Sequence, residues 1–319
     1  MVCNDPAIFS PHLLSPAHGG RPQVRERVFI VAVRNDGMSV NDLSLDRPVV
    51  SNLPIFGWDP NSWDLEKDLD LDDASKVEKY LLNDYELYWI EAWNDFVVNM
   101  LEIRNGRRLP GFPLWGDEWR LSSELEITKD VPVWKADFLR KNAAFYTDHK
   151  QFIDTWTKKW DFYSDRFPAS RRKFEWQAQD TTRLWDTIMH FRPSGIRAKR
   201  ATHVPALVAI TQTSIIGGQK RRLSPRESAR LQGLPDWFDF GNQSDAATYK
   251  QLGNSVSVGA VWHVFKQAVT QYAEFLNKTC PQLVEMVNHA PLSPDDVFQG
   301  AVQSDYANSG HAKGSFFRH

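Results

Sequence analysis

Apolar residues recur at helical spacing in two long tracts of the chain. The first tract, residues 72–101, repeats apolar side chains three or four positions apart, which places them on one face of a helix. These side chains are Val77, Leu81, Tyr85, Tyr88, Trp89, Ala92, Trp93 and Phe96. Asp72 or Asp73 is expected to cap the N-terminus of this helix, because a short acceptor side chain bonds the free amides there. The second tract, residues 137–160, carries Trp156 and Trp160 four positions apart and predicts another amphipathic helix.

Other stretches have the pattern of strands. Val28–Val33 is an unbroken run of β-branched, aromatic and small apolar residues. Such a run is typical of a strand covered on both faces in an α/β sheet. Residues 190–222 change to Gly, Pro, β-branched and basic residues, which predicts strands and loops rather than helices.

Helix signals return near the C-terminus. The stretch "LSPRESARLQGLP" offers Ser224 as N-cap, Pro225 at the first helical position and Glu227 to close a capping box. Gly233 and Pro235 mark its end.

A closing helix is predicted from Val258 to Leu276. Its buried stripe is expected to consist of Val261, Val264, Phe265, Ala268, Val269 and Tyr272. After about residue 288 the chain is polar and rich in Gly, Ser and Asp, which predicts a frayed tail.

Composition places the chain among globular proteins. Its 319 residues, 42% of them hydrophobic, suffice for one large domain or two ordinary ones. The sequence contains no run of about 18 apolar residues, the length needed to span a membrane. Its first residues lack the pattern of a signal peptide. We therefore expect a soluble, cytoplasmic protein with no membrane partner.

The sequence argues against a disulfide framework and against a metal site. Cys3 and Cys280 are the only two cysteines and have no zinc-site spacing. The acidic stretch 64–73 does not fit a calcium loop, because Asp73 and Lys79 stand where Gly and Glu are needed. No metal site is expected.

Charge is uneven along the chain, although the net charge is only -2. Cations gather in "ASRRKFEW" and in "RPSGIRAKRATH", where Arg197, Lys199 and Arg200 could neutralise DNA phosphates or read base edges. The alternative is a solvated loop. The 13 tryptophans are expected to form the core of a helical insertion rather than platforms for stacking bases.

Two short motifs have the chemistry of binding sites. In "PQVRER", Gln23, Arg25 and Arg27 alternate and would share one face of a strand, where they offer donors to a phosphate or a base carbonyl. They could equally pair with Glu26 or with acidic loops. In "YKQLGNSVSVGAVW", Gly253 permits an unusual backbone angle ahead of helix amides that suit a polar ligand, although such turns often only begin a helix.

Taken in order, "PQVRERVFIV", "RRLSPRESARLQGLPDWF" and "YKQLGNSVSVGAVW" resemble motifs VIII, IX and X of the DNA (cytosine-5)-methyltransferase family. The resemblance implies an α/β fold: the C-terminal portion of a Rossmann-like S-adenosylmethionine-dependent methyltransferase domain with a largely helical inserted target-recognition domain. The implied segments are catalytic-domain strands, a target-recognition domain, a return to the catalytic domain and a flexible tail. Their expected bounds are 1–44, 45–218, 219–277 and 278–319.

The resemblance also implies roles for single residues. Arg25 and Arg27 would line the pocket for a flipped cytosine and its phosphate, with Gln23 in support. Asn254, Ser255 and Val256 would form one wall of the S-adenosylmethionine site. Residues 221–234 would organise the recognition domain. Many family members carry a Thr-Leu pair near its end, where this chain has Ala206 and Leu207.

The family's nucleophile motif Pro-Cys-Gln, its acid motif Glu-Asn-Val and its Gly-rich cofactor turn do not occur in the sequence. The nearest strings are "TCPQ", which contains Cys280, and "EMV" at 285–287, both after the last motif. We therefore expect only the C-terminal part of such an enzyme, with no catalytic nucleophile, a partial S-adenosylmethionine site and no activity alone. Its expected partners are duplex DNA and an N-terminal methyltransferase subunit. The alternative is a non-catalytic, sequence-specific DNA-binding module or the remnant of an interrupted gene.

Overall fold

The computed structural model describes residues 2–34, 47–207 and 213–300. The chain divides into two compact units. Unit 1 comprises residues 1–71, 202–211 and 225–319, and unit 2 comprises residues 72–201 and 212–224. Both helices and strands occur in each unit, as the predicted α/β class requires. Within the described residues, no helix is both long and apolar enough to cross a membrane.

Short strand pairs make up the β structure of unit 1. Two pairs are antiparallel, β2 with β4 and β1 with β5, and β3 pairs in parallel with β10. Their bounds are β1 Val2–Cys3, β2 Ala7–Phe9, β3 Gln23–Val24, β4 Arg27–Phe29, β5 Ala32–Val33 and β10 Val204–Pro205.

The prediction of one strand buried on both faces over Val28–Val33 was wrong. The run is divided between β4 and β5, and its residues alternate between core and solvent. Phe29 and Val31 pack against the core, whereas Val28 is 61% exposed and Ile30 is 67% exposed. Since side chains alternate along a strand, only one face of this ribbon is covered in the described structure.

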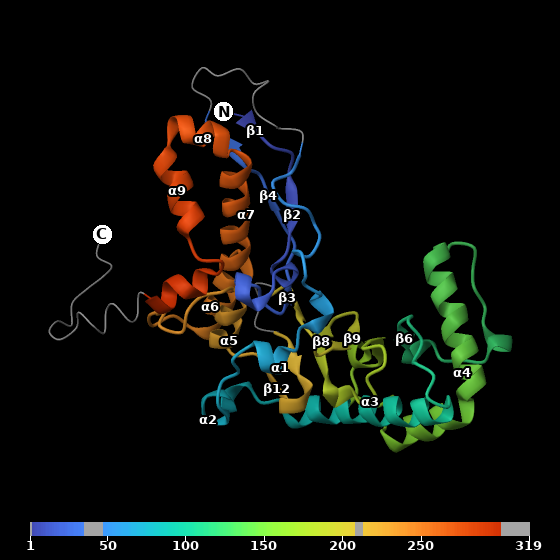
Figure 1. Ribbon diagram of the computed structural model, residues 1–319. Coiled ribbons are helices and arrows are strands. Elements are labelled where there is room, and N and C mark those ends of the chain that lie inside the picture. The colour runs from blue at the N-terminus through green and yellow to red at the C-terminus, as the bar shows by residue number, and fades with distance from the viewer. Residues whose placement is uncertain (1, 35–46, 208–212, 301–319) are drawn as a thin grey trace. The chain divides into compact units, whose positions relative to one another are not determined.

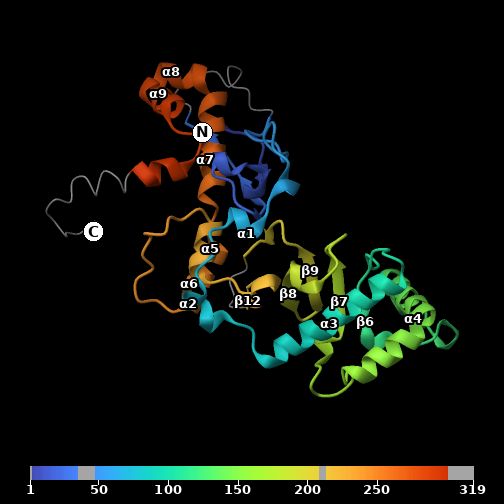
Figure 2. The ribbon, with the colours of Figure 1, turned by 60° about the horizontal axis from the view of Figure 1, so that its bottom comes forward.

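Helices form the other half of unit 1. The predicted closing helix is present as two helices that meet at Tyr272. Part of the predicted tail, residues 281–289, forms a further helix, α9 in Figure 2. Its Val284 and Val287 pack on Val269. The bounds are α1 Leu65–Asp68, α5 Pro225–Leu231, α6 Asp245–Asn254, α7 Val258–Gln271, α8 Ala273–Thr279 and α9 Pro281–His289. Residues 301–319 of the predicted tail lie outside the described residues.

The core of unit 1 lies between α7 and the strands β2 and β4 (Figure 1). Ala260, Val264 and Ala268 of α7 pack with Phe9 in this core. The predicted stripe is therefore correct at Val264, Ala268, Val269 and Tyr272. It is wrong at Val261 and Phe265, which are 46% and 48% exposed. At the start of α7 the buried face instead carries the small residues Gly259 and Ala260.

Unit 2 is built on a six-stranded sheet with the strand order β12-β11-β8-β9-β7-β6. The strands at its centre, β7 to β9, are five or six residues long. The insertion predicted to be largely helical therefore contains this sheet as well as long helices, and the strands predicted for residues 190–222 are present. The bounds are β6 Leu114–Trp115, β7 Lys173–Gln177, β8 Thr187–Arg192, β9 Gly195–Arg200, β11 Ile215–Ile216 and β12 Arg221–Arg222.

The two long helices predicted in this unit are α3 (Asp84–Ile103) and α4 (Val133–Lys159), preceded by the short α2 (Ala74–Val77). The long helix begins later than predicted. Asn83, rather than Asp72 or Asp73, caps α3 in a reciprocal capping box with Glu86. Because both side chains bond backbone amides, two free donors of the first turn are satisfied.

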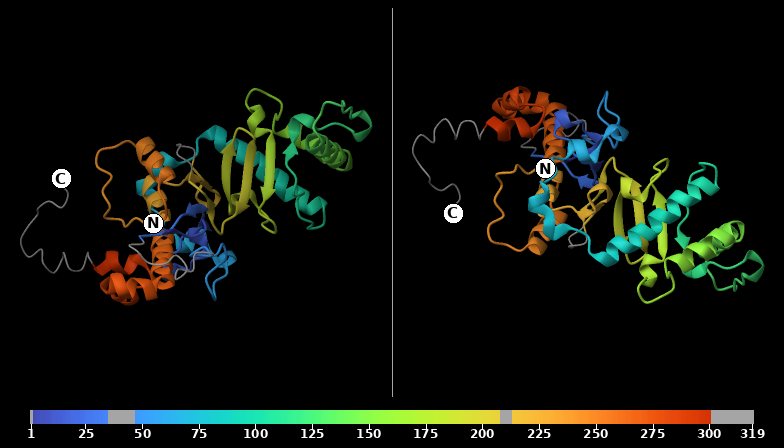
Figure 3. Two further views of the ribbon diagram at one scale, coloured as in Figure 1. Left: turned by 90° about the horizontal axis from the view of Figure 1, so that it is seen from above. Right: turned by 90° about the horizontal axis from the view of Figure 1, so that it is seen from below.

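Aromatic packing joins α3 to the sheet, and α3 lies across one face of it (Figure 3). The indole of Trp93 stacks on Phe174 of β7 with ring centres 4.6 Å apart. Trp156 of α4 lies 5.1 Å from Trp93 in the same core. The prediction that tryptophans form the core of this insertion is confirmed for these residues, which are fully buried.

The bounds of the two compact units differ from the predicted segment bounds. The boundary at 44/45 lies outside the described residues, but Val49 and Val50 pack in the core of unit 1. Residues 219–224, predicted to lie in the returning segment, belong to unit 2 together with the sheet. Unit 2 thus begins and ends later in the sequence than the predicted insertion.

Candidate cofactor and DNA-binding site

The first and second motif blocks meet at a buried pair of amides in unit 1. Gln23 on β3 and Gln232, just after α5, are both fully buried. The Nε2 atom of Gln232 donates a hydrogen bond to Oε1 of Gln23 at 3.1 Å. The Nε2 of Gln23 and the Oε1 of Gln232 have no partner among the described residues. Gln23 is thus part of the interior junction between these two blocks.

Arg25 joins the first block to the third. Its side chain is 1% exposed, and among the described residues its guanidinium donates only to backbone carbonyls. Nη1 donates to the carbonyl of Leu207 at 2.9 Å, and Nη2 donates to that of Gly253 at 2.7 Å. Both Nε and Nη2 donate to the carbonyl of Ser255, at 3.1 and 2.5 Å. The backbone amide of Arg25 donates to Oγ of Ser10 at 2.8 Å.

These acceptors explain how a cation is held inside the unit without a carboxylate contact. Gly253 and Ser255 lie at the C-terminal end of α6, where carbonyls lack helical partners and the helix dipole favours positive charge. Burial, and secondarily the charge of Arg27, lowers the pKa of Arg25 to about 10. Arg25 therefore stays protonated at neutral pH but has no side-chain surface left to offer a DNA phosphate, contrary to the predicted contact.

Arg27 has a different environment. It is half-buried at the start of β4, and among the described residues its guanidinium has one acceptor, the carbonyl of the adjacent Glu26 at 2.8 Å. The predicted single strand carrying Gln23, Arg25 and Arg27 is interrupted, since β3 ends at Val24. Of the two arginines, Arg27 thus keeps donors available for a ligand.

The predicted cofactor residues lie where α6 gives way to α7. Asn254 ends α6, Ser255 is its C-cap, and Ser257 precedes α7. Asn254 and Val256 are exposed, whereas Oγ of Ser255 donates to the carbonyl of Leu252 at 2.8 Å. The expected special turn at Gly253 is absent, because Gly253 is helical and has no positive φ. The structure therefore brings Arg25 and the segment 253–255 together through backbone atoms.

Glycine allows the segment just before the first block to approach the start of α7. A Cβ atom added to Gly259 would lie 2.0 Å from the carbonyl oxygen of Gly19. The amide of Val258 donates to the carbonyl of Gln232 at 2.8 Å, which fixes the end of the second block to the same helix start. All three blocks therefore meet at the N-terminus of α7.

The second candidate site is the face of the unit 2 sheet that points away from its aromatic core. Register places Glu175 of β7 beside Arg197 of β9, which lies beside His190 of β8. The carboxylate of Glu175 accepts from Nε of Arg197 at 2.9 Å and from Nη2 of Arg192 at 2.5 Å. Among the described residues, Lys199 has no carboxylate or hydrogen-bond acceptor for its ammonium group. We call Arg192, Arg197 and Lys199, together with Glu175, the cationic sheet face.

The electrostatics of this face favour an anion. Three cations share one carboxylate, and Nε of Arg192 is buried without an acceptor in the described structure. Burial, followed by the charges of Arg197 and Arg192, lowers the pKa of Lys199, although Glu175 opposes the shift. Burial and the same cations, Lys199 first, lower the pKa of His190 to about 4, so this imidazole is neutral at pH 7. Its Nε2 atom lies 2.9 Å from Oγ of Ser214.

Arg200, the third predicted DNA contact, lies at the end of β9 away from this cluster. Its Nη1 donates to Oε1 of Gln179 at 3.4 Å, and its Nε lies 3.8 Å from a carboxylate oxygen of Asp180. Sequence spacing predicted Arg197, Lys199 and Arg200 but missed Arg192 and His190. The alternation along β8 would have placed these two on the same face once the strand was recognised.

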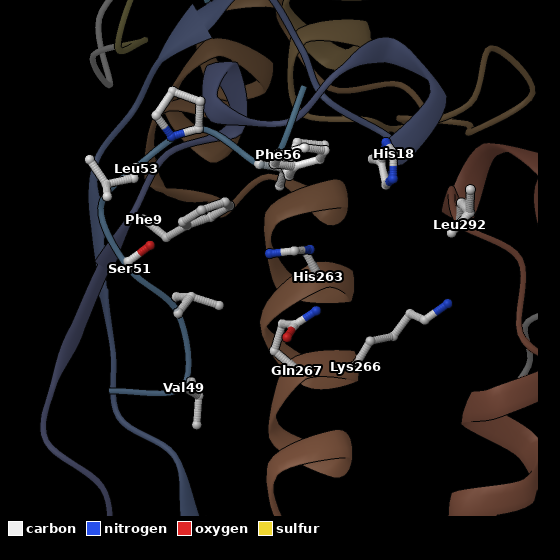
Figure 4. A pocket seen from close by; sticks show the side chains of 13 residues that line it. Phe9, His18, Val49, Ser51, Leu53, Phe56, His263, Lys266, Gln267 and Leu292 are labelled. Carbon is white, nitrogen blue, oxygen red and sulfur yellow. The ribbon is translucent and has the colours of Figure 1, made fainter. Parts of the chain in front are cut away.

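A separate pocket of about 520 Å³ lies along α7 (Figure 4). His263, Lys266 and Gln267 of α7 form one wall, and an apolar wall includes Val49 and Phe56. Burial, followed by the charges of His18 and Lys266, lowers the pKa of His263 to about 4, and its ring stacks on Phe9. None of the predicted cofactor or DNA-binding residues lines this pocket.

The two cysteine thiols are free, and the described residues form no metal-binding group. Cys3 and Cys280 are exposed and free, and Cys280 lies between α8 and α9. Over residues 2–34, 47–207 and 213–300, no group of three or more His, Cys, Asp or Glu side chains is placed to hold a metal ion.

Comparison with known proteins supports the grouping of the three blocks. The family model described as C-5 cytosine-specific DNA methylase matches residues 9–270. The chain is 39% identical to the type II methyltransferase M.AluI of Cellulosimicrobium cellulans over 372 aligned positions, which cover 94% of this chain and 71% of that protein. Shorter matches include M.HgiCI of Herpetosiphon aurantiacus, 58% identical over 41 residues that cover 13% of this chain and 10% of that protein. M.HhaI of Haemophilus parahaemolyticus is 33% identical over 70 residues, 22% of this chain and 21% of that protein. No solved structure was found to match the chain.

These matches correct one expectation from the sequence. The chain was predicted to be only the C-terminal part of a methyltransferase, but its similarity to M.AluI takes in most of both proteins. The family model likewise spans most of this chain, residues 9–270. The expected separate N-terminal subunit loses its support for the same reason. The chain belongs to the family of C-5 cytosine-specific DNA methylases.

Proposed function

We propose that this chain methylates C5 of cytosine in duplex DNA, with S-adenosylmethionine as the methyl donor, in a type II restriction-modification system. The observation that carries the proposal is the meeting of three distant motif blocks around the start of α7. Gln23 bonds Gln232, and Arg25 bonds the carbonyls of Gly253 and Ser255. Family membership supports the reaction class, and this junction supports the location of the cofactor site.

The proposed roles follow from which groups remain available to ligands. Asn254 and Val256 are exposed beside the α7 N-terminus, so they are assigned to the cofactor. Arg27 is assigned to the cytosine or its phosphate, because a guanidinium without a carboxylate partner suits bidentate contact with an anion.

The cationic sheet face is assigned to DNA. Lys199 supplies an unpaired positive charge, and Arg197 presents donors beyond the single bond from its Nε to Glu175. The base to be methylated must leave the helix before the cofactor can reach it, so DNA contacts outside the cytosine pocket hold the duplex during this step.

Methylation at C5 would require a nucleophile to add to C6 of the ring, after which C5 would attack the methyl group and displace S-adenosylhomocysteine. Loss of the C5 proton and elimination of the nucleophile would then restore the aromatic ring. Neither Cys3 nor Cys280 has the flanking residues of the family's nucleophile, so the residue that adds to C6 is left unassigned. The residues assigned above bind and position DNA and cofactor.

The test is the position of the transferred methyl group. The chain is incubated with duplex DNA and S-adenosylmethionine labelled in its methyl group, and the digested nucleosides are separated and identified by mass. We expect the label in 5-methylcytosine. Label on the exocyclic amine of cytosine or adenine, or no label in DNA, would contradict the proposal.

A further inference from the structure

We propose that Arg25 is a positioning residue that sets the shape of the cofactor-binding segment 253–256 and links it to the segment 204–207. This inference rests on the proposed function, because it assumes that the segment binds S-adenosylmethionine. According to this inference, Arg25 does not contact DNA but positions the segment that binds the cofactor.

The first argument is the direction of its hydrogen bonds. Within the described part of the chain, every acceptor of the Arg25 guanidinium is a backbone carbonyl, and those of Gly253 and Ser255 belong to the end of α6. Such carbonyls lack helical partners and have to be satisfied by another donor. Since Asn254 lies between these two residues, the guanidinium fixes the backbone on both sides of a predicted cofactor contact.

The second argument is the bond to Leu207. Nη1 of Arg25 donates to this carbonyl at 2.9 Å, while Nη2 and Nε reach Ser255. Leu207 follows β10, which pairs in parallel with β3 just before Arg25. One planar group thus fixes the spacing between two segments that are far apart in sequence.

This geometry requires a guanidinium rather than any cation. Arg presents five donors in a rigid fork, whereas the ammonium group of Lys is a single point with three donors. A lysine at position 25 would keep a positive charge near the end of α6. It would not satisfy the carbonyls of Leu207, Gly253 and Ser255 in their present places, so the turn would relax and its affinity for cofactor would fall.

The experiment compares Arg25→Lys with Arg27→Gln by measuring binding of S-adenosylmethionine and of duplex DNA across a range of salt concentrations. For Arg25→Lys we expect cofactor affinity to fall on the order of tenfold, with the salt dependence of DNA binding unchanged because no phosphate contact is lost. For the control Arg27→Gln we expect cofactor affinity within about twofold of the parent and a salt slope smaller by about 1.

Two results would overturn the inference. In the first, Arg25→Lys binds cofactor as tightly as the parent. In the second, the salt dependence of DNA binding by Arg25→Lys decreases by the amount expected for Arg27→Gln. Circular dichroism confirms that each variant is folded. If Arg25→Lys does not fold, the Nε proton of Arg25 is followed by NMR in the parent protein. Slow exchange with a resonance that shifts on addition of cofactor supports the inference, whereas fast exchange or no shift contradicts it.

Binding measurements on the parent protein distinguish a failure of this inference from a failure of the proposed function. If the parent binds neither cofactor nor DNA, the proposed function fails. If the parent binds both and Arg25→Lys leaves cofactor binding intact, the proposed function stands and only the role of Arg25 is wrong.

Discussion

Arg25 and Arg27 lie two positions apart and have different surroundings, which decides what each can contact. Arg25 is buried, and its donors satisfy carbonyls at the end of a helix. Arg27 is half-buried, with one neighbouring carbonyl as its acceptor. The same contrast separates Arg197, which is bonded to Glu175, from Lys199, which has no partner among the described residues. The availability of donors, rather than the presence of a cation, identifies the candidate ligand contacts.

Replacement of Lys199 by Gln should weaken DNA binding. Lys199 lies on the cationic sheet face without a carboxylate contact, so its charge is available to a phosphate. We expect the slope of log affinity against log salt concentration to fall by about 0.9, as for one lost phosphate contact on duplex DNA. Lys141→Gln is the matched control, because Lys141 is already paired with Asp137 on α4. Equal slopes for the two variants, measured by fluorescence anisotropy, would show that Lys199 contacts no phosphate.

The half-buried His190 should make the protein less stable in mild acid. Its pKa is about 4 in the folded protein against 6.5 for an ordinary histidine, and burial is the main cause. Between these pH values the unfolded chain binds the additional proton, so the unfolding free energy falls as the pH is lowered from 6.5 to about 4. The fall is at most about 1.4 kcal/mol for each pH unit.

His190→Gln removes this contribution, and urea unfolding at a series of pH values measures the difference. We expect the variant to lose less stability than the parent over this interval. Parallel curves for the two proteins would mean that His190 is not held neutral by its surroundings.

Residue types and spacing predicted most of the candidate site but not its geometry. Gln23, Arg27 and Asn254 lie where a binding role remains open to them, because motif blocks carry chemical identity directly. The burial of Arg25 was not predictable from the sequence. It depends on carbonyls contributed by Leu207 and Ser255, which are more than 180 residues away in sequence.

At the scale of helices and strands, the long helices were predicted more accurately than their ends. The spacing of apolar residues predicted α3 and α4, whereas the start of α3 is decided by the local bonds of Asn83 and Glu86. The run at 28–33 was read as a doubly buried strand because every residue is apolar or small. Its exposure is set by which elements cover each face, and sequence composition does not encode this.

Asn83→Ala should destabilise the start of α3. The Oδ1 atom of Asn83 accepts from the amide of Glu86 at 3.0 Å, and Glu86 accepts from the amide of Asn83 at 3.2 Å. Loss of such a cap costs about 1 kcal/mol. Asn83→Ser keeps a capping oxygen and should lose only a few tenths of this. The two variants are compared by urea unfolding, and an equal loss in both would show that the cap does not contribute.

At the scale of the whole molecule, the described chain has a separate hydrophobic core in each compact unit. Trp93, Phe174 and Trp156 centre the core of unit 2, and Phe9, Val264 and Ala268 lie in that of unit 1. The sequence predicted an insertion and strands within residues 190–222, but it did not predict β6 and β7, which pair although α4 separates them in the chain. Pairing between strands so far apart leaves no local signal in the sequence.

Trp93→Ala should affect one unit more than the other. Truncation of a fully buried tryptophan costs about 3–5 kcal/mol through lost burial and the resulting cavity. Hydrogen exchange measured by mass spectrometry should then show faster exchange in α3 and β7 to β9 than in α7. Equal acceleration in α7 would indicate that the two units unfold together.

The central claim is that the three motif blocks form one cofactor site beside the start of α7. Hydrogen exchange of the parent protein with and without S-adenosylmethionine tests it most directly. We predict slower exchange in residues 253–260 on addition of the cofactor, with no change in the cationic sheet face of unit 2. Unchanged exchange in residues 253–260, or protection confined to another part of the described chain such as the pocket beside His263, would contradict the account.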